Sequence, residues 1–89
     1  MEASLSGRRE LLREVAELVI ETVGLDHIDK NLITEQTSLV EEPFQMDSID
    51  ILEAIVAVEN RYQVKIANAN EGAKHFRSFG SILDFIEKS

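Results

Sequence analysis

The sequence predicts an all-α fold of three main helices and one short helix, with a long ordered loop between the first two. Three segments show the apolar repeat of an amphipathic helix, at residues 8–24, 47–63 and 78–88. The only proline, Pro43, lies in the loop and in none of these segments. Because 89 residues suffice for one hydrophobic core and not for two, we expect a single domain over residues 1–89.

The first helix is expected to end at Gly24, a residue type suited to the position after a helix C-terminus. Its start, near Ser4 or Ser6, is less defined because Arg8 and Arg9 are unfavourable close to a helix N-terminus. One face of this helix is apolar and consists of Leu11, Leu12, Val15, Leu18, Val19 and Val23.

Residues 24–47 break the helical pattern and contain several turn-forming residues. Loops of this length are usually either disordered or functional. Seven scattered apolar side chains are expected to anchor this loop to the core: Leu25, Ile28, Leu32, Ile33, Leu39, Val40 and Phe44. We therefore expect an ordered loop, in which Thr34 caps a single short turn.

Residues 47–63 have the densest apolar pattern in the chain, without glycine or proline. Their β-branched residues would also suit a strand, but the run is too long for one and its polar residues recur at helical intervals. The apolar residues form two neighbouring ridges, the first made of Ile51, Ala54, Ile55, Val58 and Tyr62 and the second of Ile49, Leu52 and Val56. Since one core face does not need both, the second ridge contacts a partner, lines a cavity or is covered by the long loop.

Two further helices are expected near the C-terminus. Residues 67–76 predict a short helix bounded by Asn and Gly, with Ala73 and Phe76 facing inward. Residues 78–88 predict a last helix that is capped by Ser78. The inward face of this last helix consists of Phe79, Ile82, Leu83 and Ile86.

Composition narrows the classes of function. The net charge of -8 opposes binding to nucleic acid, whereas an acidic surface suits basic docking patches on other proteins or serves solubility alone. The chain has no cysteine, so thiol chemistry requires a cofactor. We find no apolar run near the roughly 20 residues that span a bilayer and no signal-peptide pattern, and we expect a cytoplasmic protein without membrane contact.

The segment Asp47-Ser48-Ile49-Asp50 lies where the loop meets the second helix. Its two carboxylates resemble a capping box and stand where the helix dipole is positive. Ser48 is then exposed in the first turn, where free N–H groups favour an anion. The position suits a phosphorylated prosthetic group, although Asp and Ser at a helix start often serve only as caps.

The residues from Thr34 to Ile66, with TEQTSL, DSID and AVENRYQVKI, resemble the acyl carrier proteins of fatty acid and polyketide synthesis. The resemblance extends over the whole chain. It implies a four-helix bundle of that family and a 4′-phosphopantetheine arm on Ser48, which a phosphopantetheinyl transferase adds from coenzyme A. The chain would carry acyl thioesters and would not be an enzyme, since its partners supply the chemistry.

The same resemblance implies a recognition surface on the second helix. Asp47 and Asp50 would flank the serine for the transferase. Basic patches of a ketosynthase, reductase, acyltransferase or ligase would dock on Ile49, Glu53, Val56 and Glu59 of a monomeric carrier.

Two departures from the family pattern stand out. The family usually has leucine-glycine-x-aspartate-serine, whereas Phe44-Gln45-Met46 precede Asp47 here. Asn60 and Arg61 stand where the family tends to be acidic. We therefore expect a specialised carrier dedicated to one pathway.

Other functions remain as alternatives. An aminoacyl, peptidyl or D-alanyl carrier is the nearest, and an unmodified helical adaptor that binds a partner helix through the second ridge is the most different. His27 and His75 are expected to be solvated, and neither a metal site nor catalysis is expected. A calcium loop from Asp29 fails at Thr34 and Val40, where glycine and glutamate are required, and Met46 is read as an apolar filler beside the serine.

Overall fold

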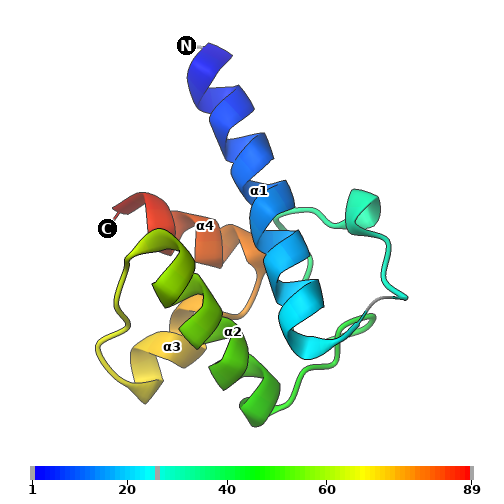
Figure 1. The fold of residues 1–89 in the computed structure, drawn as a ribbon, viewed down its shortest axis with the longest axis vertical. Coiled ribbons are helices and arrows are strands. Elements are labelled where there is room, and N and C mark those ends of the chain that lie inside the picture. The colour runs from blue at the N-terminus through cyan, green and yellow to red at the C-terminus, as the bar shows by residue number, and fades with distance from the viewer. Residues whose placement is uncertain (1, 26, 89) are drawn as a thin grey trace.

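The computed structural model describes the backbone of residues 2–25 and 27–88 and the side chains of residues 7–25 and 27–88. It confirms an all-α fold with a long connection between the first two long helices (Figure 1). In chain order the elements are α1 (Glu2–Val23), the short 3-10 helix η1 (Lys30–Leu32), α2 (Ser48–Tyr62), α3 (Ala69–His75) and α4 (Phe79–Lys88). No helix in this described part of the chain is long and apolar enough to cross a membrane.

Helix α1 ends as the sequence predicts. Gly24 has a φ of 72°, and the Leu25 N–H donates to the Ile20 carbonyl at 3.0 Å, which is the pattern of a glycine-terminated helix. The helix begins at Glu2, earlier than expected. The predicted caps Ser4 and Ser6 have side chains outside the described residues.

The four helices and the α1–α2 connection share one apolar core. Helix α1 packs against α2 and α4, and α3 packs against both α4 and α2. The rings of Phe44, from the connection, and Phe79, from α4, lie 5.3 Å apart. The buried apolar residues come from α1, the α1–α2 connection, α2, the segments on either side of α3, and α4, namely Val15, Ala16, Val19, Ile20, Ile33, Leu39, Phe44, Met46, Ala54, Val58, Val64, Phe76, Phe79, Ile82 and Leu83.

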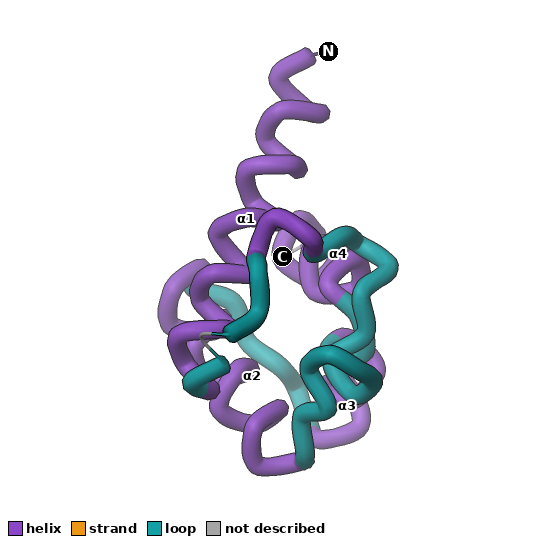
Figure 2. Tube along the Cα trace, turned by 90° about the vertical axis from the view of Figure 1, so that its right-hand side faces the viewer, coloured by secondary structure: helices purple, strands orange, loops and turns teal. Residues whose placement is uncertain are grey.

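The α1–α2 connection is ordered as predicted, and Figure 2 looks onto the face that it covers. Ile33, Leu39 and Phe44 anchor it in the core, but Leu32 and Val40 are exposed, so their prediction as anchors is wrong. Val40 follows the buried Leu39 at a bend in the connection, and its side chain lies outside the core. Leu32 ends η1, a 3-10 helix that contributes no buried residue.

Hydrogen bonds fix the path of this connection. The predicted turn at Thr34 is present, since the Thr37 N–H donates to the Thr34 carbonyl at 3.1 Å. Helix η1 was not predicted, and Asp29 caps it by accepting a bond from the Asn31 N–H at 2.9 Å. Farther along, the Leu39 N–H donates to the Arg77 carbonyl at 2.9 Å, which ties the connection to the junction of α3 and α4.

Arg8 joins three parts of the fold. Its guanidinium donates to Glu35 at 2.8 Å, to Asp84 at 3.0 Å and to Glu87 at 2.6 Å. Glu35 lies in the α1–α2 connection, and the other two carboxylates lie on α4. The bond from Arg8 lowers the pKa of Glu35, and the Glu35 bond raises the pKa of Arg8. This cluster clamps the connection and α4 against α1.

The last two helices match their predictions with one exception. Phe76 is buried after the end of α3, but Ala73 is exposed, so its inward placement is wrong. Gly72 is instead the buried residue of α3. Ser78 caps α4 as predicted, because its Oγ accepts a bond from the Ser81 N–H at 3.3 Å. The predicted inner face of α4 is confirmed, with Phe79, Ile82 and Leu83 buried and Ile86 packed against the core.

Candidate functional site

Ser48 is the first residue of α2 and is exposed. The preceding Asp47 is the helix cap, because its Oδ1 accepts a bond from the Asp50 N–H at 2.9 Å. The Asp47 carbonyl accepts the first helical bond, from the Ile51 N–H at 2.9 Å. The predicted cap is therefore present, and it places the Ser48 hydroxyl at the positive end of a helix of 15 residues.

This helix start fits a phosphodiester. The N–H groups of Ser48 and Ile49 belong to the first turn, where no intrahelical acceptor exists. The helix dipole adds a partial positive charge at the same place. A phosphate linked to the Ser48 hydroxyl is well placed to be stabilised by both, so the residues present fit a phosphopantetheine arm.

The residues before Asp47 set the position of the helix start. Met46 is buried, and its N–H donates to the Leu39 carbonyl at 2.9 Å. Gln45 has a φ of 47°, in the left-handed region that favours glycine. Gln45 thus holds a glycine-like conformation at the position where the sequence lacks the expected glycine.

Helix α2 shows the two predicted ridges. In the first ridge Ala54 and Val58 are fully buried. In the second ridge the exposed fractions of the residues are 68% for Ile49, 59% for Leu52 and 46% for Val56. The long connection does not cover this second ridge, so that alternative is excluded.

The acidic residues expected to recognise partners differ in their surroundings. Asp47 and Glu53 are exposed, and Asp50 is half-buried. Glu59 is also half-buried, and its carboxylate accepts a bond from the Ile66 N–H at 2.8 Å. Glu59 therefore also has a structural role, since it holds the segment between α2 and α3.

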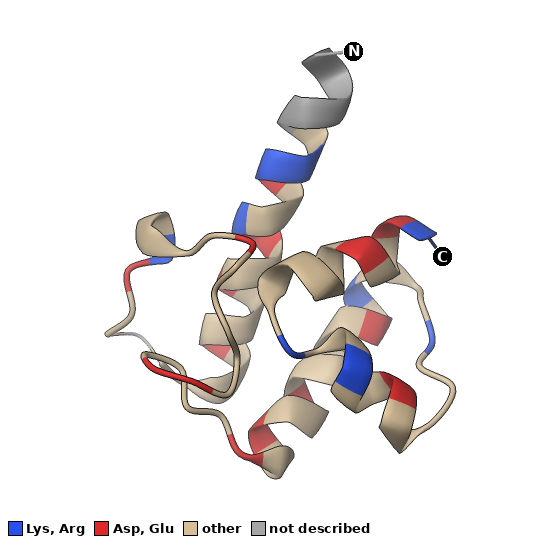
Figure 3. Ribbon diagram, turned by 180° about the vertical axis from the view of Figure 1, so that it is seen from behind, with Lys and Arg blue, Asp and Glu red and all other residues tan. Residues whose placement is uncertain are grey.

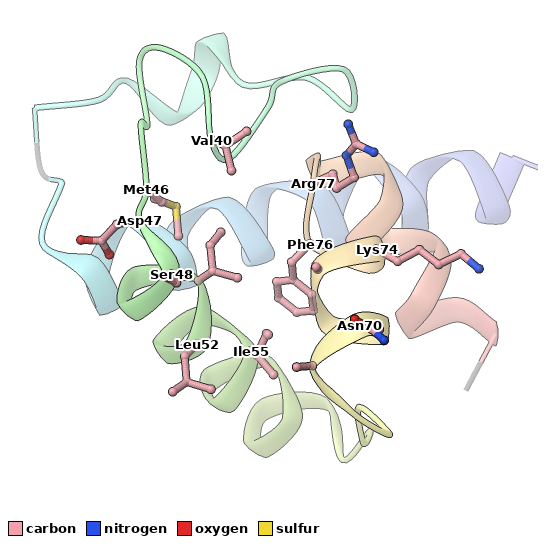
Figure 4. A pocket seen from close by; sticks show the side chains of 13 residues that line it. Val40, Met46, Asp47, Ser48, Leu52, Ile55, Asn70, Lys74, Phe76 and Arg77 are labelled. Carbon is pink, nitrogen blue, oxygen red and sulfur yellow. The ribbon is translucent and has the colours of Figure 1, made fainter.

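A cleft of about 840 Å³ opens beside Ser48, between α2, α3 and the α1–α2 connection (Figure 4). Its size falls within the range of small-molecule sites. The cleft is lined by Val40, Met46, Asp47, Ser48, Ile51, Leu52, Ile55, Ala69, Asn70, Ala73, Lys74, Phe76 and Arg77. The sequence predicted the helix that carries the serine, but it did not predict the α3 wall.

The close approach of α3 to α2 shapes this cleft. A Cβ atom on Gly72 would lie 2.9 Å from Cδ1 of Ile55, so α3 approaches α2 at a point where only glycine fits without a shift. Ala73, which follows Gly72, lines the cleft and does not face the core. This explains why it is exposed although its helix is packed.

Neither histidine lies in this cleft. His27 is exposed as predicted. His75 is half-buried, because its Nε2 lies 3.1 Å from Glu71 Oε1 and its ring lies 5.0 Å from that of Phe85. Within residues 7–25 and 27–88, no group of three or more histidine, aspartate or glutamate side chains is placed to hold a metal ion.

Comparison with known proteins agrees with this geometry. No family model matches the chain. An acyl carrier protein from Syntrophobacter fumaroxidans is 26% identical over 76 residues, which are 85% of this chain and 86% of that protein. One from Buchnera aphidicola is 32% identical over 76 residues, which are 85% of this chain and 90% of that protein.

More specialised relatives match as well. A meromycolate extension acyl carrier protein from Mycobacterium leprae is 30% identical over 81 residues, which are 91% of this chain and 65% of that protein. The Syntrophobacter and Buchnera proteins are acyl carrier proteins, which are carriers and not enzymes. The near-full-length match to the Buchnera protein shows that this chain belongs to the acyl carrier protein family.

Proposed function

We propose that this chain carries acyl groups as thioesters on a 4′-phosphopantetheine arm attached to Ser48. The main support is the exposed hydroxyl of Ser48 at the positive end of α2, in a chain of the acyl carrier protein family. The arm supplies the thiol that forms the thioester, and the chain itself has no cysteine to provide one. Residues 1–89 act as one carrier domain.

The exposed part of α2 is the proposed docking surface. Ile49, Glu53 and Val56 follow one another at helical spacing and combine two exposed apolar side chains with a carboxylate. Asp47 and Asp50 flank the serine for recognition by the phosphopantetheinyl transferase. Basic patches on synthesising, reducing and acyl-transferring enzymes would complement this surface.

The cleft beside Ser48 is the proposed resting place of the cargo. Met46, Ile51, Ile55 and Phe76 give it apolar walls, which suit a hydrocarbon chain. Cargo in the cleft is withdrawn from water until a partner binds.

A dedicated pathway is part of this proposal. Arg61 and Asn60 are exposed on the last turn of α2, so the docking surface loses acidity toward the end of that helix. Several relatives bear the name meromycolate extension acyl carrier protein. This name supports a role in one dedicated pathway for this chain as well.

Intact-mass analysis tests the attachment. After incubation with coenzyme A and a broad-specificity phosphopantetheinyl transferase, the wild type should gain the mass of one phosphopantetheine. Ser48→Ala should gain none, with a circular dichroism spectrum like that of the wild type, because the Ser48 side chain is exposed. Ser38→Ala, which removes a hydroxyl in the α1–α2 connection, should be modified like the wild type. No gain on the wild type, or an equal gain on Ser48→Ala, contradicts the proposal.

A further inference from the structure

We propose that the cleft selects cargo whose far end carries an anionic group, such as a carboxylate, and that Lys74 and Arg77 hold that end. This inference rests on the proposed function, because it concerns cargo attached through Ser48. It names the chemical class of the cargo, which the carrier role alone leaves open.

The cleft is polarised along its length. Of the described residues that line it, three are charged. Figure 4 shows Asp47 with Ser48 on one side and Lys74 with Arg77 at the opposite rim, where the two basic side chains extend outward. The Asp47 carboxylate is engaged in capping, through its bond from the Asp50 N–H at 2.9 Å. A cargo that enters from Ser48 therefore begins beside a carboxylate and ends beside two cations.

The middle of the cleft is apolar. Phe76 is fully buried and contributes its ring to the cleft wall between the two charged sides (Figure 4). Ile51 and Ile55 add branched aliphatic side chains from α2. A charged group in this middle part would lose its hydration without compensation, so an anionic group is favourable only at the far rim.

Lys74 and Arg77 are available to an anion. Within the described residues neither forms an ion pair, whereas Arg8 contacts three carboxylates and Lys30 contacts Glu17. The Arg77 carbonyl accepts the bond from the Leu39 N–H, which fixes the backbone from which the Arg77 side chain extends. Both cations can therefore bind a ligand without first breaking a contact.

Lys74 and Arg77 are two cations in a chain whose net charge is negative. Lys74 and Arg77 lie where α3 meets the loop before α4, other basic residues lie on α1, and acidic residues recur on α1, α2, α3 and α4 (Figure 3). A net charge of -8 repels a free anion from most of the surface. The rim formed by Lys74 and Arg77 is the place in the cleft where that repulsion is locally reversed.

Two acyl groups of equal length test the inference. A broad-specificity phosphopantetheinyl transferase loads Ser48 from coenzyme A, hexanoyl-coenzyme A or adipoyl-coenzyme A, with adenosine 3′,5′-bisphosphate as the leaving group. The arm then ends in a free thiol, in a hexanoyl thioester, or in an adipoyl thioester, which has the same six carbons and ends in a carboxylate. The Tm of each form is compared in the wild type, in Lys74→Gln/Arg77→Gln, and in Lys65→Gln/Lys88→Gln. The last variant is the matched control, since it removes two exposed cations that do not line the cleft.

The cleft variant should lower the Tm of the adipoyl form by about 3 °C more than that of the hexanoyl form. The control variant should change both forms equally. High salt should reduce the extra stability of the wild-type adipoyl form, because the two cations are exposed and salt screens them.

Two results would overturn the inference while leaving the carrier role intact. If Lys74→Gln/Arg77→Gln shifts the Tm of the adipoyl and hexanoyl forms equally, the two cations do not bind the carboxylate at the end of the cargo. If the same variant shifts the Tm of the form without an acyl group as much as that of the adipoyl form, Lys74 and Arg77 bind the phosphodiester of the arm. Failure of Ser48 to be loaded at all is a different result, which contradicts the proposed function, and the inference then falls with it.

Discussion

Gln45 shows how a single residue determines where the candidate site begins. Its φ of 47° turns the chain between the buried Phe44 and the buried Met46, and Asp47 then caps α2. The backbone of a residue that has a Cβ atom is strained in this left-handed conformation by roughly 1–2 kcal/mol. The surrounding anchors impose this conformation on a residue that does not favour it.

Replacing Gln45 with glycine should therefore stabilise the protein. The relief of strain exceeds the greater freedom of glycine in the unfolded chain, so the free energy of unfolding should rise by roughly 0.5–1 kcal/mol. Chemical denaturation of the unmodified protein measures this change. Gln36→Gly is the matched control, because Gln36 is exposed and has no positive φ. The control should be destabilised, and a destabilised Gln45→Gly would show that the conformation is not strained.

For single residues, the sequence predicts helix caps well and predicts less well which apolar side chains are exposed. The Asp47 cap and the exposed Ser48 follow from neighbouring residues alone, so they could be read from DSID. The exposure of Leu32 and Val40 depends on which side of the connection meets the core, and no local pattern states this. The conformation of Gln45 is likewise imposed by its anchored neighbours.

At the scale of elements, the helix that carries the serine was predictable and the cleft was not. The broad apolar arc of α2 follows from helical periodicity, which is a property of consecutive residues. The second wall requires α3 to approach Ile55 at Gly72, and that contact joins residues from different helices. The direction of Ala73 is set by this packing, which is why its predicted inward placement was wrong.

The stability that the ion pair between Arg8 and Glu35 contributes depends on pH. Arg8 lowers the pKa of Glu35 below its ordinary value of 4.5, so the ionised carboxylate is favoured in the folded state. The stability that results is fully present above about pH 4.5 and is lost as the pH falls through the lower pKa of the folded state. The effect is modest, about 1 kcal/mol at most, because both side chains are partly exposed.

Glu35→Gln tests this clamp. At neutral pH it should reduce the free energy of unfolding, and the difference from the wild type should shrink as the pH falls below about 4.5. Denaturant titrations at several pH values measure the difference. Glu41→Gln is the control, since the Glu41 side chain is exposed and forms no ion pair within the described residues, and its difference from the wild type should stay near zero. A Glu35→Gln difference that does not depend on pH would mean that the charge of Glu35 contributes nothing.

At the scale of the whole molecule, negative charge and exposed apolar residues occur together on α2. Ile49 and Val56 are exposed beside Glu53, and the chain as a whole has a charge of -8. Long-range attraction speeds the approach of a basic partner, and short-range apolar contact then holds it. The two contributions differ in their response to salt, because only the first is screened.

The rate at which the transferase loads Ser48 should therefore fall as ionic strength rises. Glu53→Gln should lower kcat/KM at low salt and should weaken the dependence on salt, because it removes a charge beside the docking ridge. Glu10→Gln removes the same charge from an exposed position on α1, so it should change both quantities much less if position matters more than net charge. Equal effects of the two substitutions would assign the attraction to the total charge of the chain. In that case α2 would orient its partners through Ile49 and Val56 alone, and the acidic residues around Ser48 would serve the helix and not recognition.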